Sequence, residues 1–209
     1  SVNSVRIEFR GVACHSSLKP HGLNAIEHAA VVIRQISEYG DRLAATGPYD
    51  EAYEVPYSTV GVNIVHGGIA NNTVADSCVI EADFRTIAAD DPRALYDTLR
   101  GYALAQGELM TAAHPDAGVD VRLLSMVPGL ETSPDGPAVE LARALGLEVS
   151  DAKVTYGTEA GQFSGAGMDA IVCGPGDIAQ AHGANEYVAL DQLAACETML
   201  TRLVQQLSR

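Results

Sequence analysis

The chain has 209 residues, of which 47% are hydrophobic and 19% are charged, a composition that provides a packed core and excludes an intrinsically disordered protein. Its 13 Lys and Arg residues against 27 Asp and Glu residues give a formal charge of −14, which repels nucleic-acid phosphates and anionic lipid. We therefore expect neither nucleic acid nor a membrane among its partners.

Three further features concern the cellular compartment. The four cysteines are far apart and include no C-x-x-C pair, so we expect reduced thiols rather than a disulfide framework. No apolar run approaches the roughly 18 residues that a membrane span needs, and the first residues, SVNSVRIEFRG, indicate a strand rather than a signal or transit peptide. These features predict a cytoplasmic protein.

The first part of the chain alternates strand and helix patterns. Residues 5–10 alternate apolar and charged side chains, which is typical of a strand with one exposed face. Residues 23–45 carry apolar side chains at helical spacing, with Asn24 in position to cap the helix. Residues 58–66 and 77–85 indicate two further strands, joined by a turn rich in glycine and asparagine.

A second helix and a fourth strand complete this pattern. Pro92 opens a helix at residues 92–113, where its missing N–H is not needed, and residues 119–127 read as the last strand. Strand, helix, strand, strand, helix, strand is the order of a split βαβ fold. For residues 1–128 we therefore predict an α+β, ferredoxin-like domain, with two helices on one face of a four-stranded antiparallel sheet.

The pattern changes after residue 128. Residues 137–145 and 190–207 predict helices, and short strands are expected near Val154 and at residues 170–173, with a glycine-rich turn and a helix between them. About 80 residues of such α/β material are close to the lower size limit of an independent domain. We expect residues 129–209 to belong to a larger sheet.

The histidines are the first candidates for metal binding or proton transfer, and none lies in an H-E-x-x-H motif. Because a catalytic zinc needs three protein ligands and an open position, local spacing predicts no complete zinc site. His182 follows the strand expected at residues 170–173, and ligands bind at the carboxyl ends of strands in α/β sheets. It is either a metal ligand or a loop histidine that bonds to the backbone.

Other polar residues also have two interpretations. The segment GTEAG leads into a helix, where Thr158 either caps the helix or leaves free N–H groups for a substrate carboxylate. His15 follows the first strand, Asn71 and Asn72 occupy a turn, and Arg85 ends a strand. These patterns alone favour structural roles without a function in binding or catalysis: a helix cap, turn residues and solvated charges.

Four segments together resemble the zinc amidohydrolase family of acetylornithine deacetylase, succinyl-diaminopimelate desuccinylase, aminoacylase and glutamate carboxypeptidases. The segments are GVACHSSLKPHGLNAIEHA, GGIANNTVADSCVIEADFR, YGTEAGQFSGAG and CGPGDIAQAHGANEYV, and they follow one another in the family's order. The HSS triplet after the first strand and the closing segment are most similar to the acetylornithine deacetylase branch.

The resemblance implies that residues 1–128 form a lid, or dimerisation, domain and that residues 129–209 are the C-terminal part of a catalytic domain. His182 matches the family's last metal ligand. The other ligands of two zinc ions, or of cobalt in their place, would belong to a preceding segment that this chain lacks, so the chain alone is expected not to hold the metals and to be inactive. The complete protein would hydrolyse N-acetylornithine, or another N-acyl amino acid, with a metal-activated water.

The same resemblance implies roles for residues of the lid. His15 matches a histidine that reaches the site of the neighbouring subunit and donates to the oxyanion, so a homodimer through the lid is expected. Asn72 and Arg85 match residues that hold the α-carboxylate of the substrate, and Asn71 is expected to assist.

In the second part of the chain, Gly157, Thr158 and Gly161 match a helix-start loop that contacts the polar end of the substrate.

Two alternatives to this function stay open. A sibling enzyme, such as a desuccinylase or a broad aminoacylase, would share every one of these residues. A non-enzymatic module for dimerisation or small-molecule binding would share the split βαβ fold.

Overall fold

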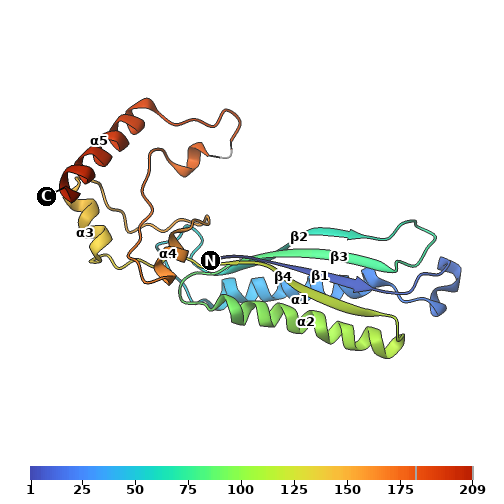
Figure 1. Ribbon diagram of the computed structural model, residues 1–209. Coiled ribbons are helices and arrows are strands. Elements are labelled where there is room, and N and C mark those ends of the chain that lie inside the picture. The colour runs from blue at the N-terminus through green and yellow to red at the C-terminus, as the bar shows by residue number, and fades with distance from the viewer. Residues whose placement is uncertain (182, 209) are drawn as a thin grey trace. The chain divides into compact units, whose positions relative to one another are not determined.

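The computed structural model describes residues 1–181 and 183–208, which divide into two compact units (Figure 1). Unit 1 comprises Ser1–Gly129 together with Lys153–Gly157, and unit 2 comprises Leu130–Ala152 together with the described residues from Thr158 onward. The chain thus leaves unit 1, returns to it for five residues and leaves it again.

Unit 1 is an antiparallel sheet in the order β2-β3-β1-β4, and two helices cover one of its faces (Figure 1). The predicted α+β fold with a four-stranded antiparallel sheet is confirmed. Its elements in chain order are β1 (Val2–Arg10), η1 (Ser16–His21), α1 (Ala25–Thr46), β2 (Thr59–Gly67), β3 (Ser77–Arg85), α2 (Pro92–Ala113) and β4 (Gly118–Val127).

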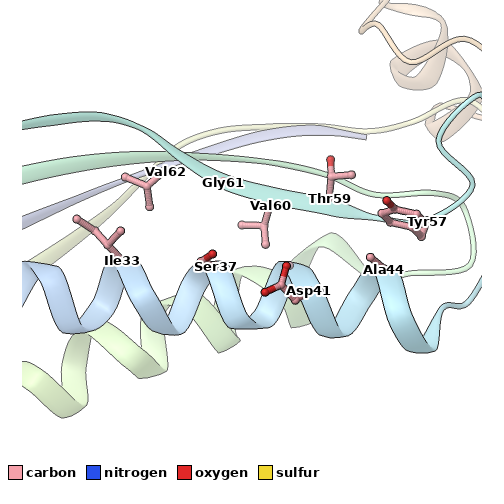
Figure 2. Close-up of a pocket in the computed structure, with 10 residues that line it drawn as sticks. Ile33, Ser37, Asp41, Ala44, Tyr57, Thr59, Val60, Gly61 and Val62 are labelled. Atoms are coloured by element: carbon pink, nitrogen blue, oxygen red, sulfur yellow. The ribbon is translucent and has the colours of Figure 1, made fainter.

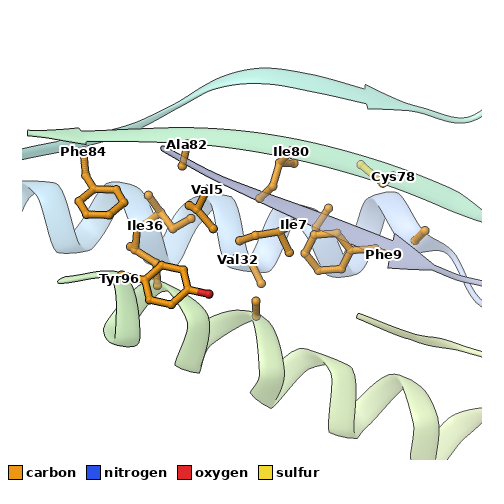
Figure 3. Close-up of a cluster of buried hydrophobic side chains, with 14 of the residues drawn as sticks. Val5, Ile7, Phe9, Val32, Ile36, Cys78, Ile80, Ala82, Phe84 and Tyr96 are labelled. Carbon is orange, nitrogen blue, oxygen red and sulfur yellow. The ribbon is translucent and has the colours of Figure 1, made fainter. Parts of the chain in front are cut away.

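The core of unit 1 lies between the sheet and the helices (Figure 3). Alternate residues of β1 and β3 point toward the helices and are fully buried, while the intervening residues stay partly exposed. This alternation separates an apolar face from a charged face on each strand. The buried residues of these two strands are Val5, Ile7, Phe9, Cys78, Ile80, Ala82 and Phe84, together with the polar Asn3.

The helices complete this core, with two departures from the predicted apolar stripes. Ile26 and Leu109 fall at the helical spacing of the apolar residues in the helices expected at residues 23–45 and 92–113, but the two residues are 39% and 59% exposed. Ala25 and Met110, their neighbours in sequence, are buried instead. A helix turns by about 100° at each residue, so an error of one position moves a side chain off the buried face.

Both helices of unit 1 begin with a side-chain cap. The Asn24 side chain accepts a hydrogen bond from the Ile26 N–H at 3.0 Å, as predicted. The Asp91 carboxylate accepts one from the Arg93 N–H at 2.8 Å, and Pro92 occupies the first helical position. Such caps satisfy backbone donors that have no partner within the helix.

Unit 2 contains helices α3 (Pro137–Ala144), α4 (Ala160–Gly165) and α5 (Leu190–Leu207) and the short helix η2 (Ile178–Gln180). The prediction of strands near Val154 and at residues 170–173 is wrong. A strand needs a neighbouring strand for its N–H and C=O groups, and within residues 1–181 and 183–208 neither segment pairs with one. Apolar β-branched residues alone therefore did not suffice to form a sheet.

Two findings concern membrane-spanning helices and the cysteines. In the described part of the chain, no helix combines the length and the apolar character that crossing a membrane would require. The four cysteines, Cys14, Cys78, Cys173 and Cys196, are free thiols, and burial raises the pKa of the Cys78 thiol.

Candidate functional site

His15 lies at the start of η1, shortly after β1. The Ser17 N–H donates to Nδ1 of His15 at 3.2 Å, and the Ser17 hydroxyl oxygen lies 2.8 Å from the same nitrogen. A ring nitrogen that accepts a backbone N–H carries no proton, so the neutral imidazole carries its proton on Nε2. Because the residue is exposed, its Nε2–H is available to donate to another molecule.

The turn that carries Asn71 and Asn72 is held beside His15 by backbone pairing. His15 forms an isolated antiparallel bridge with Thr73, and the Ser16 N–H donates to the Asn72 carbonyl at 2.9 Å. Both asparagines are exposed. His15, Asn71 and Asn72 therefore form one group of exposed polar side chains, which we call the His15 cluster.

Arg85 ends β3 and lies on the sheet face that the helices do not cover. Its neighbours across the sheet are Val2 on β1 and Thr59 on β2. The Arg85 Nε–H donates to Asp83 Oδ1 at 2.8 Å, and the arginine side chain is 42% exposed. Within the described residues, the outer N–H groups of the guanidinium contact no second carboxylate, so they are available for an anionic ligand.

Gly157 reaches the same end of the sheet as Arg85. A Cβ atom at this position would lie 3.1 Å from Cγ2 of Val2, the residue that pairs with Arg85. That distance is tighter than an ordinary contact, so a side chain here would push the segment away from the strand. The glycine therefore lets the backbone lie close to the end of β1.

Lys153 anchors the segment that carries Gly157. Its N–H donates to the Ala52 carbonyl at 2.9 Å, and its ammonium lies 2.8 Å from Asp50 Oδ2 and 5.4 Å from the centroid of the Tyr53 ring. The hydrogen bond from Lys153, with help from the Ala52 N–H, holds the pKa of the Asp50 carboxyl below its ordinary value. The Gly157 segment is thus tied to the loop that follows α1.

Thr158 and Gly161 belong to unit 2. The Thr158 hydroxyl accepts a hydrogen bond from the Ala160 N–H at 3.2 Å, immediately before the six-residue helix α4, and Gly161 is buried within that helix. The cap position itself is held by Glu159, which makes no capping bond with its side chain. The hydroxyl of Thr158 thus satisfies a local backbone donor, and contact with a substrate stays a prediction.

The His15 cluster and Arg85 lie at opposite ends of the sheet. Strands β1 and β3 pair from Val2–Arg85 to Arg10–Ser77, and the eight steps from Ser77 to Arg85 (85 − 77 = 8) extend over roughly 26 Å. Asn72 precedes Ser77 and lies beyond the far end of this strand. The resemblance implied that Asn72 and Arg85 hold the same carboxylate. At this separation, the two residues of one chain cannot both contact one small carboxylate.

The described residues do not assemble a metal centre. His182, the predicted ligand, lies outside the residues that the structure describes, and among those described no three His, Cys, Asp or Glu side chains come together. His114 and Asp116 have H-x-D spacing, but they close the end of α2, where the Asp116 N–H donates to His114 Nδ1 at 3.2 Å. This donor set does not fit a pair of zinc ions.

A groove of about 440 Å³ lies elsewhere in unit 1, between α1 and the edge strand β2 (Figure 2). Ile33 of α1 lies on one side of it, and Val60 and Val62 of β2 lie on the other. No residue of the His15 cluster lines it, and neither do Arg85 and Gly157, so it is not a candidate substrate site. Its lining consists of Ile33, Ser37, Gly40, Asp41, Ala44, Tyr57, Thr59, Val60, Gly61 and Val62.

Comparison with known proteins identifies the family of this chain. The family model M20_dimer, described as the peptidase dimerisation domain, matches residues 1–108. The chain belongs to the M20 family. The enzymes of this family are metal-dependent hydrolases.

Two relatives of this M20 chain are acetylornithine deacetylases. The protein of Myxococcus xanthus is 31% identical over 205 residues, which cover 95% of this chain and 50% of the relative. The protein of Salmonella arizonae is 32% identical over 202 residues, which cover 97% of this chain and 50% of the relative. The chain thus spans about half the length of the curated relatives it matches.

Solved structures share the fold of the M20 chain. Aminopeptidase PepT from Bacillus cereus matches with a TM-score of 0.71 at 21% identity, over 100% of this chain and 52% of that one. A tripeptidase from Staphylococcus aureus matches with a TM-score of 0.68 at 20% identity, over 95% of this chain and 49% of that one. At such identities the likeness concerns the fold alone.

Proposed function

We propose that this chain is part of an amidohydrolase that removes the acyl group from an N-acyl amino acid, with N-acetylornithine as the substrate. The support is the similarity to acetylornithine deacetylases over nearly the whole chain. Residues 1–128 act as the lid, and residues 129–209 contribute His182 to a catalytic domain. Two zinc ions, or cobalt in their place, would lower the pKa of a bound water and polarise the acyl carbonyl.

Most of the metal ligands come, in this proposal, from a further segment of the complete protein. Two observations support it: the matched relatives are about twice as long as the chain, and the described residues bring no three potential ligands together. The 209 residues alone should therefore be inactive. Hydrolysis of N-acetylornithine by this polypeptide alone would contradict the proposal.

The substrate site is shared between two subunits. The observation that carries this proposal is that β3, which extends over roughly 26 Å from Ser77 to Arg85, lies between the His15 cluster and Arg85. An N-acyl amino acid is much shorter than this. If both groups serve one substrate, each active site takes Arg85 from one subunit and the His15 cluster from its partner.

Each end of the lid then has a defined role. The Nε2–H of His15 donates to the oxyanion that forms when water attacks the acyl carbonyl, and Asn72, with Asn71 beside it, adds amide donors at that end. Arg85 holds the α-carboxylate through its two outer N–H groups, a geometry that a guanidinium fork matches. The Gly157 backbone lies at the Arg85 end, and Thr158 and Gly161, which follow it in the chain, would contact the polar end of the substrate.

A homodimer forms, in this proposal, along α1 and β2. The matching family model is a dimerisation domain, β2 is an edge strand, and the groove beside it exposes apolar side chains (Figure 2). Ser37→Arg places a bulky charge in the groove from the exposed side of α1 and should shift the protein to a monomer in light scattering. Ala105→Arg, on the exposed side of α2, should leave the dimer intact; two dimeric variants would contradict this interface.

The function is tested by assaying the complete protein with N-acetylornithine and N-succinyl-diaminopimelate. Removal of one oxyanion donor typically lowers the rate by roughly 10²–10³, so His15→Ala should lower kcat by that factor. Arg85→Lys should mainly raise KM, because it removes the fork but keeps the charge. Preference for the succinylated substrate would make the enzyme a desuccinylase, and no turnover of any N-acyl amino acid would favour a binding module.

A further inference from the structure

Three arginines on the open face of the sheet share one local arrangement. Each donates its Nε–H to a carboxylate two residues away on its own strand. Side chains two residues apart on a strand point to the same face, so the alternation of the sequence creates these pairs. The three distances are 2.7 Å for Arg6–Glu8, 2.8 Å for Arg85–Asp83 and 2.9 Å for Arg122–Asp120.

The three pairs differ in the exposure of the arginine and in whether its outer guanidinium N–H groups contact a second carboxylate. Arg6 also donates from Nη1 to Glu81 at 3.0 Å, so it is shared between two carboxylates. Arg122 lies on the edge strand β4, and its side chain is 66% exposed. Arg85 lies on an interior strand, is 42% exposed and keeps its outer N–H groups free of other carboxylates among the described residues.

The Asp83 carboxylate has no competing donor across the strands. Its neighbours are Ser4 on β1 and Gly61 on β2. The Ser4 hydroxyl bonds to the Ser125 hydroxyl instead, at 2.8 Å, and Gly61 has no side chain. Asp83 therefore has room to turn toward Arg85 and accepts its Nε–H.

We infer that Asp83 is a positioning residue, which orients Arg85 to bind the α-carboxylate of the substrate. This inference rests on the proposed function. Acceptance of the Nε–H fixes the plane of the guanidinium and directs the edge formed by Nη1 and Nη2 away from the strand. The ordering of a long side chain is then completed before the substrate arrives, which lowers the cost of binding.

If the Asp83–Arg85 pair served only the stability of the fold, loss of Asp83 would lower the thermal midpoint. The exposure of the pair argues against this. Exposed ion pairs contribute little to stability, and both partners here are more than a third exposed. Loss of Asp83 should therefore leave the thermal midpoint of the protein almost unchanged. The effect should fall on Arg85 and on carboxylate binding alone.

The test uses the 209-residue chain with Asp83→Asn, Asp83→Glu and the matched control Asp120→Asn. Nitrogen-15 NMR measures the solvent exchange of the Arg85 Nε–H, which Arg85→Lys assigns by removing the signal. N-acetylglycine serves as the carboxylate probe, and its dissociation constant is read from the shifts of residues at the Arg85 end. Circular dichroism checks that each variant is folded.

Asp83→Asn should speed the exchange of the Arg85 Nε–H and raise the dissociation constant roughly three- to tenfold, the effect of one side chain that must be ordered on binding. Asp83→Glu should restore part of both, and Asp120→Asn should change neither. If Asp83→Asn leaves the affinity unchanged while Arg85→Lys weakens it, the inference about Asp83 is wrong and the role of Arg85 stands. If Arg85→Lys also binds as the wild type does, the proposed carboxylate role fails and the inference fails with it.

Discussion

The two units of the chain use apolar side chains in opposite ways. In unit 1, α1 buries Ala25, Ala29, Val32, Ile36 and Leu43 against the sheet. In unit 2, α5 has a comparable apolar stripe, yet it buries no residue, and the exposed fractions reach 63% at Val204 and 75% at Leu207. Periodicity therefore predicts that a helix is amphipathic, but burial requires a second surface within reach.

This contrast agrees with the proposed function. Contiguous exposed apolar surface usually marks a place where another protein surface binds. Unit 1 has a sheet and two helices around one core, so it can fold around its own residues. The apolar stripe of α5 is the surface on which, in our proposal, the rest of the catalytic domain packs.

The largest expected effect separates the cores of the two units. Phe84 is fully buried in the sheet of unit 1, and Phe84→Ala should lower the free energy of unfolding by about 3–5 kcal/mol. Leu200 on α5 is 50% exposed, so Leu200→Ala should change that free energy by less than about 0.5 kcal/mol. Urea unfolding followed by circular dichroism measures both; equal losses would show that α5 is packed.

The second prediction concerns the helix caps. Asn24→Ala removes the acceptor of the Ile26 N–H and should cost about 1 kcal/mol, while Asn24→Asp keeps an acceptor and should cost little. Ala189 occupies the cap position before helix α5 and provides no capping side chain, so Ala189→Asp should increase the helical signal. No gain from Ala189→Asp would mean that the start of α5 is already fixed by other contacts.

The smallest expected effect is the dependence of the Lys153–Asp50 pair on pH. The pKa of Asp50 in the folded chain lies below its ordinary value of 3.8, because Lys153 donates to the carboxylate. The pair therefore stabilises the fold at pH values above 3.8 and stops doing so as the pH falls through the lower, folded pKa. Lys153→Met should lower the thermal midpoint at pH 7, and the difference from the wild type should vanish in strong acid.

Asp50→Asn provides the control for this prediction. With no ionisable group at position 50, the change in midpoint that Lys153→Met causes in the Asp50→Asn background should not depend on acid. A difference that persists unchanged in strong acid in the parent chain would show that the Lys153 side chain acts through its contact with the Tyr53 ring rather than through its pair with Asp50.

The sequence predicted unit 1 well because its signals are local and agree with one another. The strand expected at residues 77–85 and the helix expected at residues 92–113 have the bounds of β3 and α2. Alternation and helical spacing each report a buried face directly. The strands expected near Val154 and at residues 170–173 did not form, because strand formation depends on a partner, which short apolar runs do not specify.

The sequence supplied candidate site residues but not their arrangement in the fold. The resemblance singled out His15, Asn72 and Arg85. It did not indicate that thirteen residues (85 − 72 = 13) of turn and extended strand keep the last two apart. The pairing of Asp83 with Arg85 was missed, although their spacing of two on a strand was a usable signal.

The shared site is tested most directly by mixing two inactive variants of the complete enzyme. His15→Ala and Arg85→Ala should each abolish most of the hydrolysis of N-acetylornithine. When the two are unfolded and refolded together, half of the dimers are mixed and each of these carries one intact site, so roughly a quarter of the wild-type activity should return. Activity that stays at the level of the separate variants would show that His15 and Arg85 of one chain serve the same substrate, which would contradict a site divided between subunits.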